Sequence, residues 1–170
     1  ILDHLNYLSN DRSSNIKTKI MNEKQIYFKN KKILIYGFGK SGFACFNFLK
    51  NNNICTIFDD KKKNIPVRFR KKFIDFHKLT SANFDFIVLS PGIDIKKCKI
   101  SSFLRKNRNK IITELDIFAI SYPNINKITI TGTNGKSTTS KLLYEVLKNN
   151  KKDVRLTGNI GYPNINGKKN

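Results

Sequence analysis

Short apolar runs alternate with helix-length segments from residue 31 onward. Lys32 to Tyr36 (KILIY) predicts a buried strand, and after a glycine loop Phe43 to Lys50 has helical character with apolar residues on most sides. Ile54 to Phe58 (ICTIF) predicts a second strand, and Phe84 to Leu89 (FDFIVL) predicts a third. Strands that alternate with helices in this way are typical of βαβ units, so we predict a parallel sheet covered by helices.

A fourth strand and a short helix complete this first unit. Lys110 to Thr113 predicts the strand, and Leu115 to Ile120 predicts the helix. The helix is expected to end before Tyr122-Pro123-Asn124, because proline disfavours helical backbone in the residue that precedes it. We place a domain boundary there.

The segment beyond that boundary begins a second unit. Lys127 to Thr131 (KITIT) predicts a strand, and Ser137 to Asn149 predicts a helix with an apolar face. Asp153 to Thr157 is a candidate for the next strand. Because about 45 residues are too few to bury a core unaided, we expect this unit to be the incomplete beginning of a domain.

The first glycine loop is Gly37-Phe38-Gly39-Lys40-Ser41-Gly42, between a predicted strand and a predicted helix. In such a loop the first glycine makes the turn, the second lets the backbone approach a phosphate, and the third lets the helix pack on the strand. Asp59 ends the second strand about 20 residues later, where a carboxylate can reach a sugar or base. On these residues alone the ligand is a phosphate-bearing nucleotide, NAD included, and a tight turn without a ligand is the alternative.

The second glycine loop, Thr131-Gly132-Thr133-Asn134-Gly135-Lys136-Ser137-Thr138, is the more specific of the two. Amides of a P-loop surround the β and γ phosphates, its lysine neutralises their charge, and the next hydroxyl coordinates magnesium. Lys136 and Ser137 take those roles here, which predicts binding of ATP or GTP. The loop is a variant, because Ile130 stands where the common pattern has glycine.

The predicted fold class is therefore α/β, with a Rossmann-like domain over residues 31–123 and the start of a P-loop ATP-binding domain over residues 124–170. Residues 1–30 are treated as an N-terminal extension. The sequence does not begin with methionine, and its single Met, Met21, lies shortly before the first patterned segment.

The composition narrows the class of protein. Hydrophobic residues make up 39% and aromatic residues 11% of the chain, which is typical of a globular protein. Cys45, Cys55 and Cys98 lack metal-like spacing and leave an odd thiol under any disulfide scheme. No apolar run approaches the roughly 18 to 20 residues that span a bilayer. We expect a cytoplasmic protein without a membrane segment.

The formal net charge of +21 is large enough to attract polyanions. The lysines are nevertheless scattered along the chain and lack the aromatic interleaving of an RNA-binding sheet. Runs such as Asn51 to Asn53 and Lys61 to Lys63 are those that A/T-rich codons favour. We expect no specific nucleic-acid partner, and a basic nucleic-acid-binding module is kept as an alternative.

Taken in order, these motifs resemble those of the Mur ligases, and most of all those of the members that add D-glutamate. The resemblance extends from residue 31 to about residue 165 and is carried by GFGKSG, by the strand end Phe58-Asp59-Asp60, by Ser90 to Ile93 (SPGI), by TGTNGKST, and by Gly158 to Gly161 (GNIG).

The resemblance implies ligands for both loops. In the first domain the residues for the UDP part of a muramyl substrate would be Gly39, Lys40, Ser41, Asp59, Asp60, Lys61, Ser90 and Gly92, and Asn159 would reach the same substrate. ATP would be bound by Gly132, Thr133, Asn134, Gly135, Lys136, Ser137 and Thr138, with Lys136 as the catalytic cation and Ser137 on Mg²⁺. Lys61 stands where the family commonly carries arginine, and a lysine cannot make the bidentate contact of a guanidinium.

The implied reaction is ATP-driven amide formation in peptidoglycan precursor synthesis. UDP-N-acetylmuramoyl-L-alanine would form an acyl phosphate, and the amine of D-glutamate would displace the phosphate. The family's further active-site residues and its amino-acid-binding domain have no counterpart in these 170 residues. We therefore expect a truncated N-terminal part, monomeric and without ligase turnover alone. The alternative, an NAD(P)-binding Rossmann oxidoreductase fragment, leaves Lys136 and Ser137 without a role.

Overall fold

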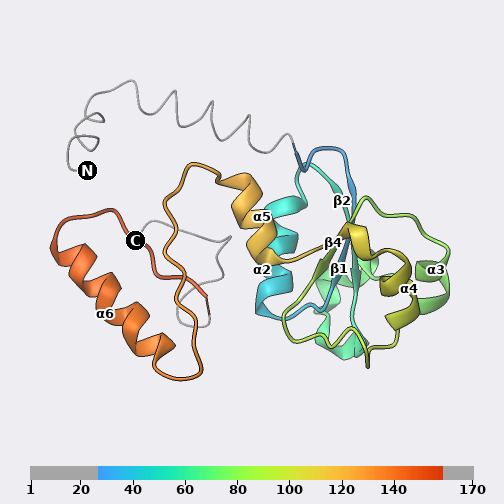
Figure 1. Ribbon diagram of the computed structural model, residues 1–170. Helices are drawn as coiled ribbons and strands as arrows, with labels where there is room; N and C mark the ends of the chain where they lie inside the picture. The colour runs from blue at the N-terminus through green and yellow to red at the C-terminus, as the bar shows by residue number, and fades with distance from the viewer. Residues whose placement is uncertain (1–26, 159–170) are drawn as a thin grey trace.

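A four-stranded, all-parallel sheet forms the centre of the protein in the computed structural model, which describes residues 27–158 (Figure 1). The strands stand in the order β2-β1-β3-β4. Their bounds are β1 (Lys32–Tyr36), β2 (Ile54–Phe58), β3 (Phe86–Leu89) and β4 (Ile111–Ile112). The central strand β1 pairs with β2 on one side and with β3 on the other. The predicted parallel sheet is thus confirmed.

Both faces of the sheet are buried, which explains the continuous apolar runs of its strands. Alternate residues of β1 point to opposite faces. Ile33 and Ile35 pack into one core cluster, and Leu34 and Tyr36 pack into the other. All four side chains are fully buried.

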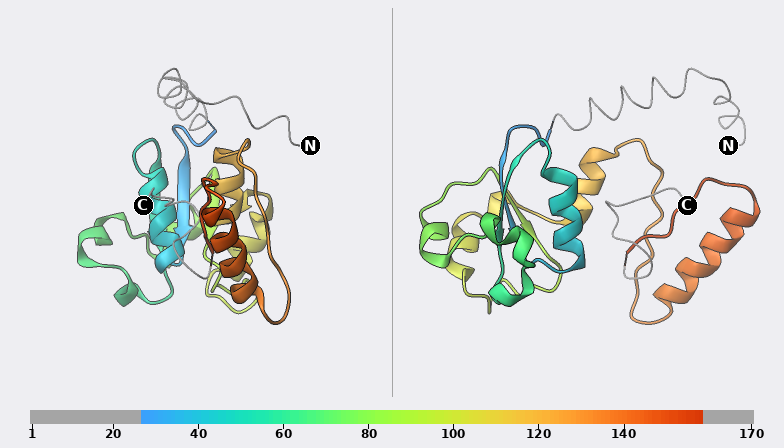
Figure 2. Two further views of the ribbon diagram at one scale, coloured as in Figure 1. Left: turned by 90° about the vertical axis from the view of Figure 1, so that its left-hand side faces the viewer. Right: turned by 180° about the vertical axis from the view of Figure 1, so that it is seen from behind.

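Helices α2 (Lys40–Leu49) and α5 (Glu114–Ser121) lie side by side on one face (Figure 1, Figure 2). Their apolar residues, among them Cys45, Leu49 and Ile117, join the first core cluster. The ring of Phe38 makes edge-to-face contacts with Phe46 and Phe69 at 5.6 and 5.4 Å between centroids. Helix α2 is therefore covered on more than one side, as its apolar composition predicts.

Helices α3 (Phe76–Thr80) and α4 (Ser101–Lys106) cover the opposite face. Leu79, Phe103 and Leu104 belong to the second core cluster with Leu34 and Tyr36. In the described part of the chain, short 3-10 helices also lie in the connections, namely η1 (Lys62–Asn64), η2 (Val67–Lys72) and η3 (Arg108–Lys110). Helices on both faces of a parallel sheet make this a doubly wound, Rossmann-like α/β domain.

The predicted and observed elements differ mainly at helix starts and in polar segments. β1 and β2 have the predicted bounds, whereas α2 begins at Lys40, directly after its N-cap residue Gly39, rather than at Phe43. Helices α3 and α4 were not predicted, since each is six residues or shorter and buries only one or two side chains.

The predicted extension contributes to the core. Phe28 is 3% exposed, and its ring lies 5.3 Å from that of Phe86. The amide of Asn30 donates to the carbonyl of Asn52 at 2.7 Å. The packed region therefore includes residues from 28 onward, within the segment that the sequence assigned to the extension.

Beyond Tyr122 the structure differs from the predicted second unit. Helix α6 (Lys136–Asn149) is formed as predicted, but the strands predicted over residues 127–131 and 153–157 are absent from the described part of the chain. A strand requires a hydrogen-bonded neighbour, and no described strand pairs with either segment. No side chain from residue 122 to residue 158 is buried. This region supplies a loop and a helix, not a packed P-loop domain.

Candidate functional site

The first glycine loop lies where the strand order reverses. β2 lies on one side of β1 and β3 lies on the other, and in parallel α/β sheets such a reversal is where ligands bind, at the carboxyl ends of the strands. The first loop follows β1, Asp59 and Asp60 follow β2, and the turn at Ser90 follows β3. Residues far apart in the sequence thus meet at one edge of the sheet.

Two glycines of the first loop are required by close packing. Gly37 has φ +88°, and a Cβ there would lie 2.8 Å from the Cβ of Ser90. A Cβ at Gly42 would lie 1.9 Å from the carbonyl oxygen of Gly37, which is inside any contact distance. A Cβ at Gly39 would meet nothing within 4 Å. The loop is therefore closed at its two ends and open at its centre.

Ser90 fastens the loop to β3. Its hydroxyl donates to the carbonyl oxygen of Gly37 at 2.7 Å, and its amide donates to the carbonyl of Tyr36 at 3.0 Å. Gly92, two residues later in the turn, has open space around it. The Ser90 side chain is thus engaged by the protein itself.

Asp59 fastens the loop to β2. The residue is 9% exposed, and its Oδ2 accepts a hydrogen bond from the amide of Phe38 at 2.9 Å. Its Oδ1 accepts from the amide of Lys61 and from Nδ2 of Asn64, each at 2.9 Å. The sequence predicted a carboxylate that reaches a ligand, and the structure gives Asp59 three protein donors in that place.

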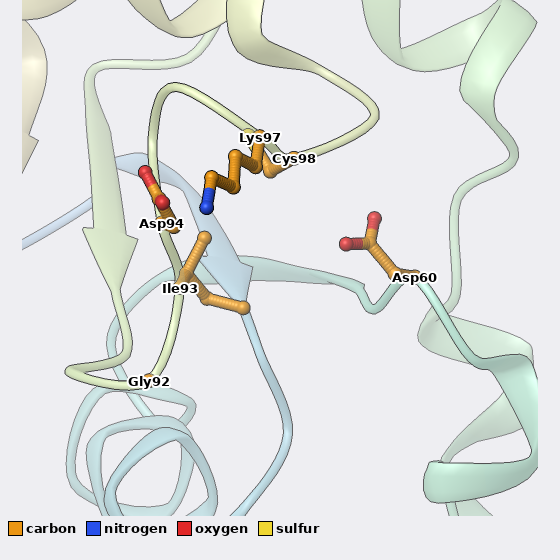
Figure 3. Close-up of a pocket in the computed structure, with 6 residues that line it drawn as sticks. All are labelled: Asp60, Gly92, Ile93, Asp94, Lys97 and Cys98. Carbon is orange, nitrogen blue, oxygen red and sulfur yellow. The ribbon is translucent and has the colours of Figure 1, made fainter.

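Asp60 borders a pocket of about 190 Å³ beside the loop. Figure 3 shows Asp60 across the pocket from Asp94 and Lys97, and the complete lining is Asp60, Gly92, Ile93, Asp94, Lys97 and Cys98. The hydroxyl of Tyr36 lies 3.0 Å from both carboxylate oxygens of Asp60. Burial, with help from hydrogen bonds to Cys98 and Asp60, raises the pKa of Tyr36 above its ordinary value, so the phenol stays a neutral donor.

The remaining candidates of the first loop differ in exposure. Lys40 and Lys61 are exposed, Lys40 as the first residue of α2 and Lys61 three residues after the end of β2. Ser41 is half-buried, and its hydroxyl donates to Oε2 of Glu114. Asn159 lies outside the described residues.

The second loop leads directly into α6. Gly132 and Gly135 have φ +145° and +73°, and Gly135 is the N-cap residue of the helix. The ammonium of Lys136 donates to the carbonyl oxygens of Gly132 and of Thr133, the latter at 3.0 Å. The positive charge therefore lies within the curve of the loop, beside the amides of a helix N-terminus. That donor set suits the terminal phosphates of a nucleotide.

Ser137 and Thr138 are exposed on the first turn of α6. They border an open depression of about 430 Å³ together with Lys141, Leu142 and Glu145. The described residues contain no group of three or more His, Cys, Asp or Glu that could hold a metal ion. The hydroxyl of Ser137 suits Mg²⁺ as one ligand of several, so it fits the predicted role without completing a site.

The amino-acid sequence is similar to those of known proteins. The model of the Mur ligase MurD-like N-terminal domain matches residues 31–112. The chain is 34% identical over 146 residues to the UDP-N-acetylmuramoylalanine--D-glutamate ligase of Rickettsia prowazekii, covering 83% of this chain and 32% of that protein. It is 36% identical over 149 residues to the ligase of that name from Thermoanaerobacter sp. (strain X514), covering 81% and 32%. Residues 31–112 of the chain therefore belong to the family of Mur ligase MurD-like N-terminal domains.

The match to the Mur ligase model includes the first loop, Asp59, Asp60, Ser90 and Gly92. The chain spans about a third of the length of the curated Mur ligases that it matches. Within residues 27–158 there is no helix of the length and apolarity that crossing a membrane requires.

Glu114 contacts the first loop, and the sequence did not suggest it as a site residue. It begins α5, directly after β4 and the N-cap residue Thr113. An acidic residue at the carboxyl end of a parallel strand is a signal that could have drawn attention to it.

Substitution of Asp59 tests its role in holding the loop. Asp59→Ala leaves the amides of Phe38 and Lys61 without their acceptor, and we expect the free energy of unfolding to fall by about 2 to 3 kcal/mol. Urea denaturation followed by circular dichroism measures the change. The matched control is Asp85→Ala, which removes an exposed carboxylate that accepts a single backbone hydrogen bond, from Lys32 at 2.7 Å. The control is expected to cost less than about 1 kcal/mol, and equal losses would contradict the role given to Asp59.

Proposed function

We propose that this chain is the N-terminal part of an ATP-dependent ligase that adds D-glutamate to UDP-N-acetylmuramoyl-L-alanine. Its first glycine loop is proposed to hold the UDP part of that substrate. The observation that carries the proposal is the open centre of the loop at Gly39, placed at the strand-order reversal and held there by Asp59 and Ser90.

The proposed diphosphate position lies at the N-terminus of α2. Amides in the first turn of a helix lack intrahelical acceptors and favour an anion. Gly39 leaves room for a close approach, and the exposed Lys40 adds a positive charge beside it. The pocket lined by Asp60 and Gly92 opens beside the same loop. We propose that it receives the uracil or its surroundings, with Lys61 at its border.

The second loop is proposed to bind ATP and Mg²⁺. Lys136 would neutralise the terminal phosphates, the loop from Gly132 to Gly135 would supply amides, and Ser137 would hold the metal. The bound nucleotide supplies the phosphoryl group that activates the substrate carboxylate for attack by the amine of D-glutamate. Lys136 is the cation of this chain that we expect to stabilise the charge on that phosphoryl group.

The cellular setting forms part of the proposal. The three cysteines are free thiols, and Cys45 and Cys55 are buried. Burial raises the pKa of the Cys55 thiol to about 11. Unreactive, reduced thiols suit a cytoplasmic protein. We propose a monomer that works in the cytoplasm, without a specific nucleic-acid partner.

Titration of the 170-residue chain with UDP-N-acetylmuramoyl-L-alanine, followed by calorimetry, tests the first loop. We expect saturable binding that free UDP competes for, and no comparable binding of NADH. Gly39→Ala is expected to weaken binding at least about tenfold, because its methyl group occupies the space that the phosphate approaches.

The stability of the Gly39→Ala variant is the control for that titration. The Cβ of Gly39→Ala meets no atom within 4 Å, so the variant is expected to unfold at nearly the same urea concentration as the wild type. Preferential binding of NADH would support the oxidoreductase alternative. Steeply salt-dependent, sequence-independent binding of DNA in place of the UDP-sugar would support a nucleic-acid-binding module.

A further inference from the structure

Glu114 brings a buried carboxylate to the first glycine loop. It is the first residue of α5, and it is 8% exposed. The capping box that starts α5 is made by Thr113 and Asp116, so Glu114 is not needed to cap its own helix. Helix α5 packs against α2, whose first turn carries Ser41.

The two carboxylate oxygens of Glu114 differ in their surroundings. Oε2 accepts the hydroxyl hydrogen of Ser41. Oε1 is buried and has no hydrogen-bond partner among the described residues. A buried carboxylate with a single protein donor is costly to folding, so stability alone does not account for its presence.

The thiol of Cys45 lies near the same pair and does not offset the charge. Burial, and after it the negative charge of Glu114, raises the pKa of Cys45 to about 12. The thiol is therefore neutral at physiological pH. The strongest described partner of the Glu114 carboxylate remains the hydroxyl of Ser41.

The contact determines how the loop can meet a phosphate. A serine hydroxyl has one hydrogen to donate. While that hydrogen is donated to Glu114, Ser41 cannot donate it to a ligand, and the donors left to the loop are its amides and Lys40. Ser41 itself is fixed between α2 and α5, on the first turn of α2.

Resting on the proposed UDP site, we propose that Glu114 is a positioning residue of the first glycine loop. Its carboxylate holds Ser41 so that the first turn of α2 presents main-chain amides to the diphosphate of the substrate. Glu114 acts through Ser41 and does not touch the ligand.

Paired substitutions separate positioning from a purely structural role. Glu114→Ala removes the acceptor and is expected to weaken binding of UDP-N-acetylmuramoyl-L-alanine to the 170-residue chain about tenfold. Glu114→Gln keeps a side-chain oxygen for Ser41 and is expected to stay within about threefold of the wild type. Ser41→Ala in the Glu114→Ala background is expected to cause no further loss, because the two residues act as one unit.

Ile117→Ala is the matched control for damage to α5. Ile117 is fully buried in the same helix, in the core cluster that contains Cys45. The variant is expected to unfold at lower urea concentration while its affinity for the UDP-sugar is unchanged. Amide hydrogen exchange without ligand gives a second readout, in which Glu114→Ala speeds exchange over residues 40–43 and Glu114→Gln and Ile117→Ala do not.

These measurements distinguish failure of the positioning role from failure of the proposed UDP site. Faster exchange and weaker binding in Glu114→Ala, restored by Glu114→Gln, support the positioning role. If Glu114→Ala binds the UDP-sugar as tightly as the wild type does, the positioning role alone is overturned. Unchanged hydrogen exchange in that variant overturns it as well. A folded wild-type chain that binds no UDP-sugar overturns both proposals.

Discussion

Gly42→Ala is expected to lower the free energy of unfolding by about 3 kcal/mol, the largest stability loss of any single methyl addition to the first loop. The added Cβ would lie 1.9 Å from the carbonyl oxygen of Gly37 and 3.0 Å from the hydroxyl oxygen of Ser90. Both oxygens are held by the hydrogen bond between them, so neither can move without breaking it. Urea denaturation followed by far-ultraviolet circular dichroism measures the loss.

Gly92→Ala is the matched control for Gly42→Ala. A Cβ at Gly92 would meet no atom within 4 Å, and its φ is not in the left-handed region. The control is therefore expected to change stability by less than about 0.5 kcal/mol. A Gly42→Ala variant as stable as this control would show that the loop does not have the described conformation.

On the proposed function, Lys136→Ala, tested in a full-length D-glutamate-adding ligase with this N-terminal sequence, is expected to reduce the rate of amide formation by about 10² to 10³. The substitution removes the single ammonium that lies against the carbonyl oxygens of Gly132 and Thr133, within the curve of the second loop. Charge that develops on the transferring phosphoryl group would then lack its nearest cation. Steady-state formation of ADP and of the amide product measures the rate.

A second lysine on α6 provides the control for Lys136→Ala. Lys148 is in the last turn of the helix, and its ammonium lies 5.5 Å from the ring of Tyr144, far along the helix from the loop. Lys148→Ala is expected to leave the rate within about twofold, since exposed single charges contribute little. Full activity and full ATP affinity in the Lys136→Ala enzyme would refute the assignment of the second loop.

The sequence correctly predicted strands that are buried on both faces of the sheet. It wrongly predicted a strand where no neighbouring strand is present to pair with it. KILIY and ICTIF form β1 and β2 at their predicted bounds, because their neighbours in the sheet are present. KITIT, over residues 127–131, has as strong a strand pattern and forms none in the described chain, where no second strand lies beside it. A strand-like pattern of residues indicates a tendency to form a strand, whereas the strand itself forms only where a neighbouring strand can pair with it.

The sequence could predict those residues of the candidate site that directly follow a strand. The first loop, Asp59 and Ser90 follow β1, β2 and β3, so parallel topology brings them together. Two details depend on tertiary packing and lie beyond a sequence pattern. One is the task of Asp59, which accepts a hydrogen bond from the amide of Phe38 in the loop, and the other is Glu114, which contacts a serine 73 positions earlier.

The hydrogen bonds from the loop to Asp59 and from Ser90 to Gly37 have a thermodynamic consequence. They immobilise the backbone of the loop when the domain folds, so the conformational entropy of ordering it is lost at that stage and not again when a ligand arrives. A preorganised loop of this kind binds with little rearrangement. Substitutions that loosen these anchors should then appear in calorimetry as a larger entropic penalty of association, even where every atom that faces the ligand is unchanged.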